Sequence, residues 1–60
     1  MTYFVFIESD ILKVPHMEPL MSEDADDALE EASELMELHS GARRAHVFYG
    51  AERIGTVQRS

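Results

Sequence analysis

The chain has 60 residues, of which 12 are acidic and 5 are lysine or arginine, a net charge of −7 and no cysteine. This length predicts a single small domain over residues 1–60, and the lack of cysteine excludes disulfides and thiolate-bound metals and favours the reducing cytoplasm. The negative charge argues against direct binding to nucleic acid or an anionic membrane, and we find no signal-peptide pattern or membrane-length apolar run.

The first predicted element is a strand over residues 2–8, TYFVFIE, which is rich in β-branched and aromatic residues. Both of its alternating faces are apolar, which favours a central strand that is buried on both sides. Residues 11–21 contain Pro15 and Pro19, which lack the backbone donor that a helix or a central strand needs. We therefore expect a loop there with a short edge strand near one end, and the sequence leaves open whether that strand forms.

The next element is a helix that begins near Ser22 or Asp24, either of which can act as N-cap. Gly41 is the expected C′ residue, which places the last turn near residues 38–40. Apolar residues line one side of this helix, and eight carboxylates without an intervening basic residue cover about 160° of the other side. The acids are Glu23, Asp24, Asp26, Asp27, Glu30, Glu31, Glu34 and Glu37.

Two further strands, residues 44–49 and 53–59, form a predicted hairpin around the turn at residues 50–52. Gly55 inside the last strand indicates a β-bulge. The element order β-(β)-α-β-β predicts an α+β fold, with a small antiparallel sheet of three or four strands and one amphipathic helix on one face. The helix residues expected to pack on the sheet are Leu29, Ala32, Leu35 and Met36.

The eight acids are neighbours at helical spacing, and their repulsion costs about 2–4 kcal/mol at low salt. Their density, about one charge per 2.6 Å of helix axis, approaches the value of about 1.7 Å for duplex DNA. Most basic residues lie after the helix, which makes the molecule bipolar. These features predict a partner-binding face made of all eight acids that docks onto a basic protein surface, although a merely solubilising face or adaptation to salt would give the same composition.

Leu38 falls within the acidic arc of the helix. It is an ordinary exposed leucine, a residue of a frayed end that folds under the sheet, or an apolar anchor in an acidic interface.

Metal binding and catalysis find little support in the motifs. The acids lie in a helix without the glycine and alternate spacing of a calcium loop. The histidines, His16, His39 and His46, are dispersed without a zinc-binding spacing, so we expect structural roles for them. No catalytic motif occurs. We therefore expect no metal, no cofactor, no catalytic residue and no enzymatic activity.

A single helix covers only one face of a sheet, whereas the predicted strands carry large apolar residues on both faces. We expect the other face either to mediate a homodimer or to be covered by the proline-bearing segment. Without self-association through this face, the protein is a monomer. The uncovered set is either Phe4, Phe6 and Phe48 or Tyr3, Val5, Ile7 and Tyr49.

In size, charge and the acidic helix SEDADDALEEASELMELHSG, the chain resembles the small phage-encoded anti-CRISPR proteins, several of which act as DNA mimics. The resemblance implies a non-enzymatic inhibitor that occupies the nucleic-acid channel of a Cas protein or of another nucleic-acid-binding protein. The alternative is a small self-associating structural or regulatory module whose acidic face only keeps it soluble.

Overall fold

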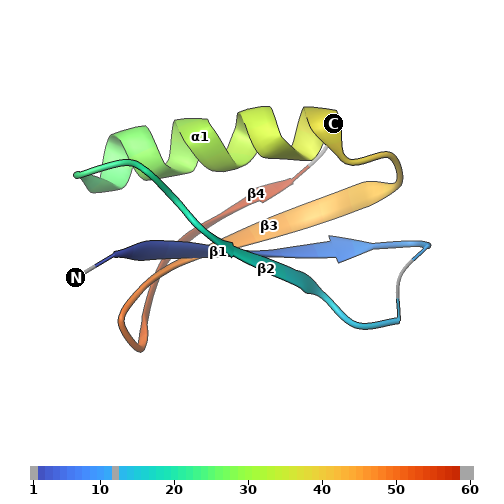
Figure 1. The fold of residues 1–60 in the computed structure, drawn as a ribbon, viewed down its shortest axis with the longest axis horizontal. Helices are drawn as coiled ribbons and strands as arrows, with labels where there is room; N and C mark the ends of the chain where they lie inside the picture. The colour runs from blue at the N-terminus through green and yellow to red at the C-terminus, as the bar shows by residue number, and fades with distance from the viewer. Residues whose placement is uncertain (1, 12, 59–60) are drawn as a thin grey trace.

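Four antiparallel strands form one sheet, and a single helix packs across one of its faces (Figure 1). The computed structural model describes residues 2–11 and 13–58. The sheet order is β2-β1-β3-β4, so the predicted α+β architecture is confirmed in its four-stranded form. The elements in chain order are β1 (Tyr3–Ser9), β2 (His16–Pro19), α1 (Ala25–Leu38), β3 (Ala42–Tyr49) and β4 (Glu52–Gln58).

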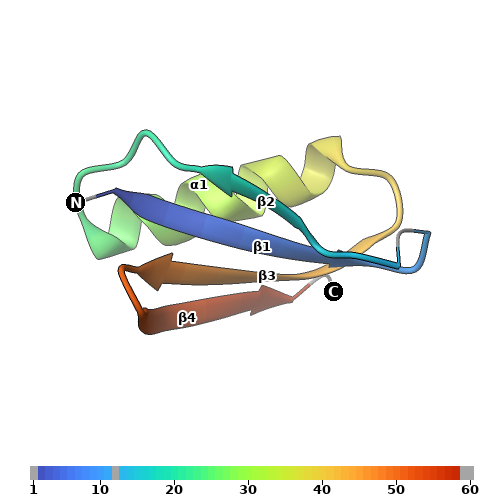
Figure 2. The same cartoon turned by 60° about the horizontal axis from the view of Figure 1, so that its bottom comes forward.

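The proline-bearing segment extends the sheet at its edge (Figure 2). β2 pairs antiparallel with β1, with His16 opposite Ile7 and Pro19 opposite Phe4. An edge position tolerates Pro19 because the missing backbone donor is not needed by a further strand. The expected short edge strand is confirmed, and the alternative that this segment folds across the open sheet face is wrong.

The core lies between α1 and the face of the sheet that carries the smaller residues. Alanines on α1 and β3 have short side chains, which allow the helix to approach the sheet closely. Leu29 and Leu35 are half-buried at the flanks of this contact, so the predicted packing face of the helix is confirmed. The buried residues are Val5, Ile7, Leu20, Ala28, Ala32, Met36, Ala42, Ala45 and Val47.

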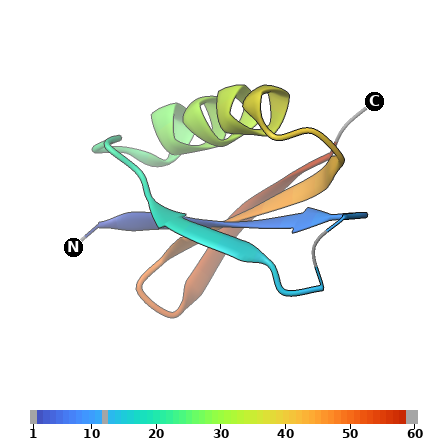
Figure 3. The ribbon, with the colours of Figure 1, turned by 45° about the vertical axis from the view of Figure 1, so that its right-hand side comes forward.

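The opposite face of the sheet carries an aromatic patch, which consists of Phe4, Phe6, Phe48 and Met17. Phe4 lies opposite Phe48 in the register of β1 and β3, and the ring centroids of Phe6 and Phe48 are 5.3 Å apart. Among the described residues no helix or strand covers this face (Figure 3), and Phe6 and Met17 are 37% and 56% exposed. The prediction that β1 is central is confirmed, but the prediction that both of its faces are buried is wrong.

Short-range contacts define both ends of α1. Asp24 is the N-cap, and its Oδ1 accepts a hydrogen bond of 2.9 Å from the backbone N–H of Asp27. The C-cap is His39, so Gly41 lies one residue beyond the C′ position predicted for it. Gly41 has φ +84°, a backbone conformation that favours glycine, whereas the end of the exposed Ile11 side chain, 2.8 Å from the position of a Cβ, could move aside.

A bulge interrupts the pairing of β3 with β4. Val47 lies opposite Gly55 and Phe48 opposite Arg53, so Ile54 is the extra residue, next to the glycine that predicted a bulge. A Cβ on Gly55 would lie 3.0 Å from Leu29 Cδ2 of α1. The glycine therefore gives the helix room at the edge of the sheet. Both strands of the hairpin begin earlier than predicted, and residue 59 lies outside the described residues.

Within residues 2–11 and 13–58, no helix combines the length and the apolar character needed to cross a bilayer.

Candidate functional site

Five of the eight predicted acids form a line of exposed carboxylates on α1, which we call the acidic stripe. Within residues 2–11 and 13–58, none of them takes part in an ion pair. The backbone of α1 holds them at helical spacing, on the side turned away from the buried alanines. The stripe consists of Asp26, Asp27, Glu30, Glu34 and Glu37.

Two of the predicted acids lie before the helix, which begins at Ala25. Glu23 is exposed in the connection from β2, and Asp24 is the N-cap. The expectation that all eight acids share one helical face is therefore wrong for this pair. The carboxylate of Asp24 serves the fold, because it accepts the backbone donor of Asp27 at the positive end of the helix dipole.

Glu31 also serves the fold. Its carboxylate is half-buried and accepts hydrogen bonds from the backbone N–H of Met21 at 3.0 Å, the N–H of Ser22 at 3.0 Å and the Ser22 hydroxyl at 2.6 Å. Burial raises the pKa of this carboxyl, but the hydrogen bonds from Ser22 and Met21 together lower it below its usual value. Glu31 thus holds the connection from β2 against α1, and a partner would have to break these bonds to engage it.

Crowding within the stripe is visible at its N-terminal end. The charge of Asp24 raises the pKa of the Asp27 carboxyl, and the hydrogen bond between these carboxyl groups and the charges of Glu30 and Asp26 add to the effect. The ionised form of Asp27 is therefore disfavoured in the fold. The repulsion between like-charged neighbours that the sequence predicts therefore acts on Asp27.

Leu38 projects into solvent at the C-terminal end of α1, with 80% of its surface exposed. This exposure excludes the alternative that it folds under the sheet. The other two alternatives, an ordinary exposed leucine and an apolar anchor, both fit its position.

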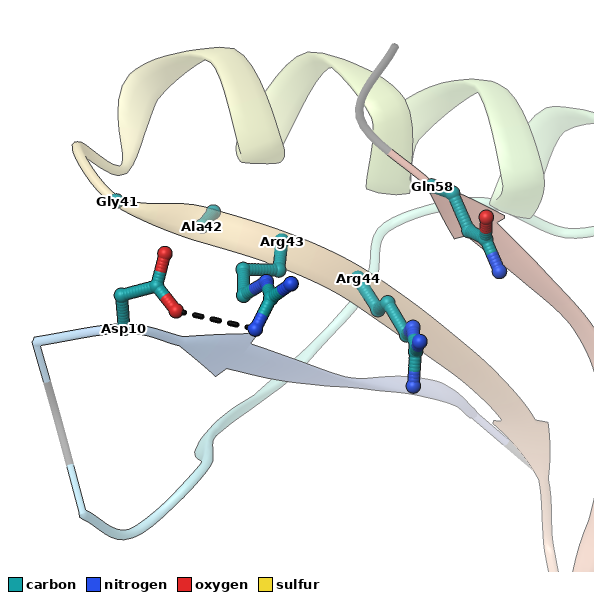
Figure 4. A pocket seen from close by; sticks show the side chains of 6 residues that line it. All are labelled: Asp10, Gly41, Ala42, Arg43, Arg44 and Gln58. Carbon is teal, nitrogen blue, oxygen red and sulfur yellow. Dashed lines mark ion pairs between the residues drawn. The ribbon is translucent and has the colours of Figure 1, made fainter.

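The arginines of the described residues lie on β3 and β4, away from the stripe. Arg43 and Arg44 line a surface hollow of about 330 Å³ together with Asp10, Gly41, Ala42 and Gln58 (Figure 4). The Arg43 guanidinium lies 3.2 Å from Asp10, which partly neutralises it. Most of the acids therefore lie on α1 or next to its N-terminus, whereas the arginines of the described residues lie on the sheet, where Glu8, Glu18 and Glu52 are also found.

His46 joins three strands at the border of the aromatic patch. Its Nε2 lies 2.5 Å from a carboxylate oxygen of Glu8 on β1, and its Nδ1 lies 3.1 Å from the Thr56 hydroxyl on β4. The hydrogen bond from His46 lowers the pKa of the Glu8 carboxyl, burial opposes this effect, and the positive charges of Arg44 and Arg43 assist it. These contacts give His46 the structural role expected for it.

The other two histidines lie close together in space. His16 on β2 and His39 at the C-cap of α1 have ring centroids 5.0 Å apart, and His16 Nε2 lies 2.9 Å from Glu18 Oε2. One nitrogen or oxygen atom from each of His16, Glu18 and His39 lies within 4.8 Å of those of the other two. The sequence contained no signal for this cluster, because His16 and His39 are far apart along the chain and only the fold brings them together.

Comparison of the chain with protein-family models, with curated proteins and with solved structures finds no match. Function is therefore inferred from the geometry of these residues.

Proposed function

We propose that the protein is a non-enzymatic binding protein of the cytoplasm that docks its acidic stripe onto a basic surface of a partner protein. The observation that supports this proposal most strongly is the set of five exposed carboxylates on one side of α1, none of which pairs with a basic residue among those described. An unneutralised anionic surface of this kind complements a cationic one and accelerates association with it.

The spacing of the stripe fits a nucleic-acid groove. From Asp26 to Glu37 the helix axis advances about 16 Å, so the five carboxylates follow one another at about 4 Å on average. A single strand of duplex DNA carries one phosphate per about 3.4 Å of axis, whereas the two strands together carry one per about 1.7 Å. With Asp24 and Glu31 engaged in the fold, the stripe imitates one strand. A Cas protein or another nucleic-acid-binding protein offers a groove of that kind, and occupying it would inhibit the protein by exclusion of its nucleic acid.

One feature favours a docking surface over a solubilising one, and a second is compatible with it. The acids are concentrated on a single helix, although dispersal over the sheet would confer solubility without the repulsion that raises the pKa of Asp27. Leu38 extends from the same helix beyond the stripe and is exposed enough to enter an apolar hollow in a partner.

The test is a double charge reversal, Glu30→Lys with Glu34→Lys, in the middle of the stripe. Purified nucleic-acid-binding proteins, with Cas proteins among them, are mixed with a fluorescent nucleic acid, and its displacement by this protein is followed by anisotropy. The wild-type chain should displace the nucleic acid from its partner, and its affinity should fall as the salt concentration rises. The charge-reversed chain should lose the displacement.

A matched control separates the stripe from net charge alone. Asp10→Lys with Glu52→Lys makes the same change of charge outside α1, at two exposed residues. This variant should retain most of the displacement, and circular dichroism should show that both variants are folded. Equal displacement by the wild-type chain and the stripe variant would contradict the proposal.

A second candidate function, self-association as a structural or regulatory module, is favoured by the aromatic patch. Phe6 and Met17 are exposed on a face that no helix or strand of the described residues covers, and a second copy of this chain could bury them. Light scattering should then give the mass of a dimer, which Phe6→Ser should convert to a monomer while Glu30→Lys with Glu34→Lys leaves it intact. A monomeric wild-type protein at high concentration would rule this candidate out.

A further inference from the structure

Three potential metal ligands from two separate elements meet at one end of the sheet. His16 and Glu18 are two residues apart on β2, so their side chains lie on the same face of that strand, and His39 reaches them from the C-cap of α1. Each residue offers a nitrogen or oxygen atom within 4.8 Å of the atoms of the other two. All three residues are half-buried.

We propose that His16, Glu18 and His39 form a binding site for a divalent transition metal, with Zn²⁺ as the ion that fits the donor set best. Two imidazole nitrogens and one carboxylate oxygen are ligands that zinc takes at about 2.0–2.2 Å, in sites that keep a fourth position for water or another ligand. The site is separate from the acidic stripe and does not depend on the function proposed for it.

The geometry needs only side-chain adjustment. Tetrahedral bonds of that length place ligand atoms about 3.3–3.5 Å from one another. His16 Nε2 and Glu18 Oε2 are 2.9 Å apart, and no pair in the cluster exceeds 4.8 Å, so rotation about side-chain torsions of His39 and Glu18 closes the remaining distance. The backbone of β2 and of the helix end can stay in place.

The surroundings of His39 favour ligation over an ordinary structural role. Within the described residues its imidazole makes no hydrogen bond and instead lies against the ring of His16, at a centroid distance of 5.0 Å. A metal ion would use the ring nitrogens of both histidines and would bring the Glu18 carboxylate into the same site as a compensating charge.

A neighbouring cavity leaves room for the fourth ligand. The cavity has a volume of about 170 Å³, and its walls include His16 and His39 together with Ile7 and Ile11. Ser9 and Ser40 supply hydroxyl groups to the same lining. A metal-bound water molecule, or a small anion in its place, can therefore lie over the end of β1.

Binding would also join two elements that the sheet leaves separate. β2 is an edge strand that pairs with β1 alone among the described strands, and α1 packs on other parts of the sheet. A metal ion held by both would stabilise the folded chain, because it binds this arrangement and not the unfolded one.

The experiment is a calorimetric titration of the full chain with Zn²⁺, at physiological salt and with Mg²⁺ in excess to occupy the carboxylates of the acidic stripe. The wild-type chain should bind one ion per molecule and unfold at a higher temperature when the ion is bound. His16→Gln and His39→Gln should each weaken binding by about tenfold or more, since each removes one of three ligands. The matched control is His46→Gln, which removes a histidine outside the cluster and should leave Zn²⁺ affinity unchanged.

Circular dichroism first establishes that each variant is folded. If a variant does not fold, nuclear magnetic resonance of the wild-type chain decides, because Zn²⁺ should shift the imidazole signals of His16 and His39 and spare those of His46. The proposal is overturned if the wild-type chain does not bind Zn²⁺, if His16→Gln and His39→Gln bind it as the wild type does, or if the signals of all three histidines respond equally.

Discussion

The hydrogen bonds of Glu31 lead to a quantitative prediction for Glu31→Ala. This substitution removes the acceptor for the backbone N–H groups of Met21 and Ser22 and for the Ser22 hydroxyl. It releases the connection between β2 and α1, for which the described residues provide one other side-chain hydrogen bond to the helix, the one that the Asp24 cap accepts from the backbone N–H of Asp27. The free energy of unfolding should therefore fall.

The size of the effect follows from the three donors. A hydrogen bond to a charged acceptor contributes about 1.5–3 kcal/mol when it is well shielded from water, and an ordinary one contributes about 0.5–1.5 kcal/mol. Met21 is almost fully exposed and Ser22 is half-buried, so water replaces much of what is lost. We expect a loss of about 1–2 kcal/mol, which lowers the melting temperature of a domain of this size by about 5–15 °C.

The matched control is Glu30→Ala, at the adjacent position of the same helix. It makes the same change of charge and of helix propensity, but the side chain of Glu30 makes no hydrogen bond with another described residue. This variant should be as stable as the wild type or slightly more so, because it relieves repulsion within the stripe. Thermal unfolding followed by circular dichroism measures both variants, and equal melting temperatures would refute the role assigned to Glu31.

The pH dependence of this difference gives an independent check. The pKa of Glu31 is lowered from its ordinary value of 4.5, so the folded state favours the ionised carboxylate. The stability that the ionised Glu31 carboxylate provides is complete above the ordinary pKa of 4.5 and is lost as the pH falls through the lower pKa of the folded state. The melting temperatures of Glu31→Ala and Glu30→Ala should differ at neutral pH and converge in acid.

Three further substitutions test other features of the fold. Asp27→Asn should raise the melting temperature at neutral pH, because Asp24 raises the pKa of Asp27 and so disfavours its charged form in the fold. This gain in melting temperature should disappear at high salt, which screens the repulsion. It should also disappear as the pH falls through the raised pKa towards the ordinary value of 3.8. Gly55→Ala should lower the free energy of unfolding, measured with denaturant, by about 1–2 kcal/mol, because its Cβ would press on Leu29. The loss should be smaller in a Leu29→Ala background, and an equal loss in both backgrounds would refute the contact. Gly41→Ala should cost about 1–2 kcal/mol because φ is +84° there, and an unchanged unfolding midpoint would contradict that reasoning.

Local patterns in the sequence determined the identity of the elements. The β-branched and aromatic run at residues 2–8 predicted a strand, because such side chains pack well on a pleated surface, and β1 occupies Tyr3–Ser9. The helix follows from apolar spacing and from the Asp24 cap, whose partner is only three residues away. Pro15 and Pro19 limited the intervening segment to an edge, because the lost backbone donors are a property of the residue itself.

The face that α1 covers was decided by tertiary structure. Both faces of β1 are apolar, so alternation alone could not choose between the Val5 side and the Phe6 side. The helix packs on the side where β3 contributes Ala45 and Val47, because small side chains allow close approach, and the phenylalanines remain on the other side.

The candidate sites also combine residues that the sequence reveals with contacts that only the tertiary structure makes. Their residues were visible in the sequence as an acidic run and as dispersed histidines, but the uses of individual side chains were not. Glu31 is engaged because the chain returns from β2 past the helix, and His39 meets His16 because the end of α1 reaches the end of β2. Composition and periodicity report on neighbours a few residues apart, whereas these contacts join segments that only the packing of helix on sheet brings together.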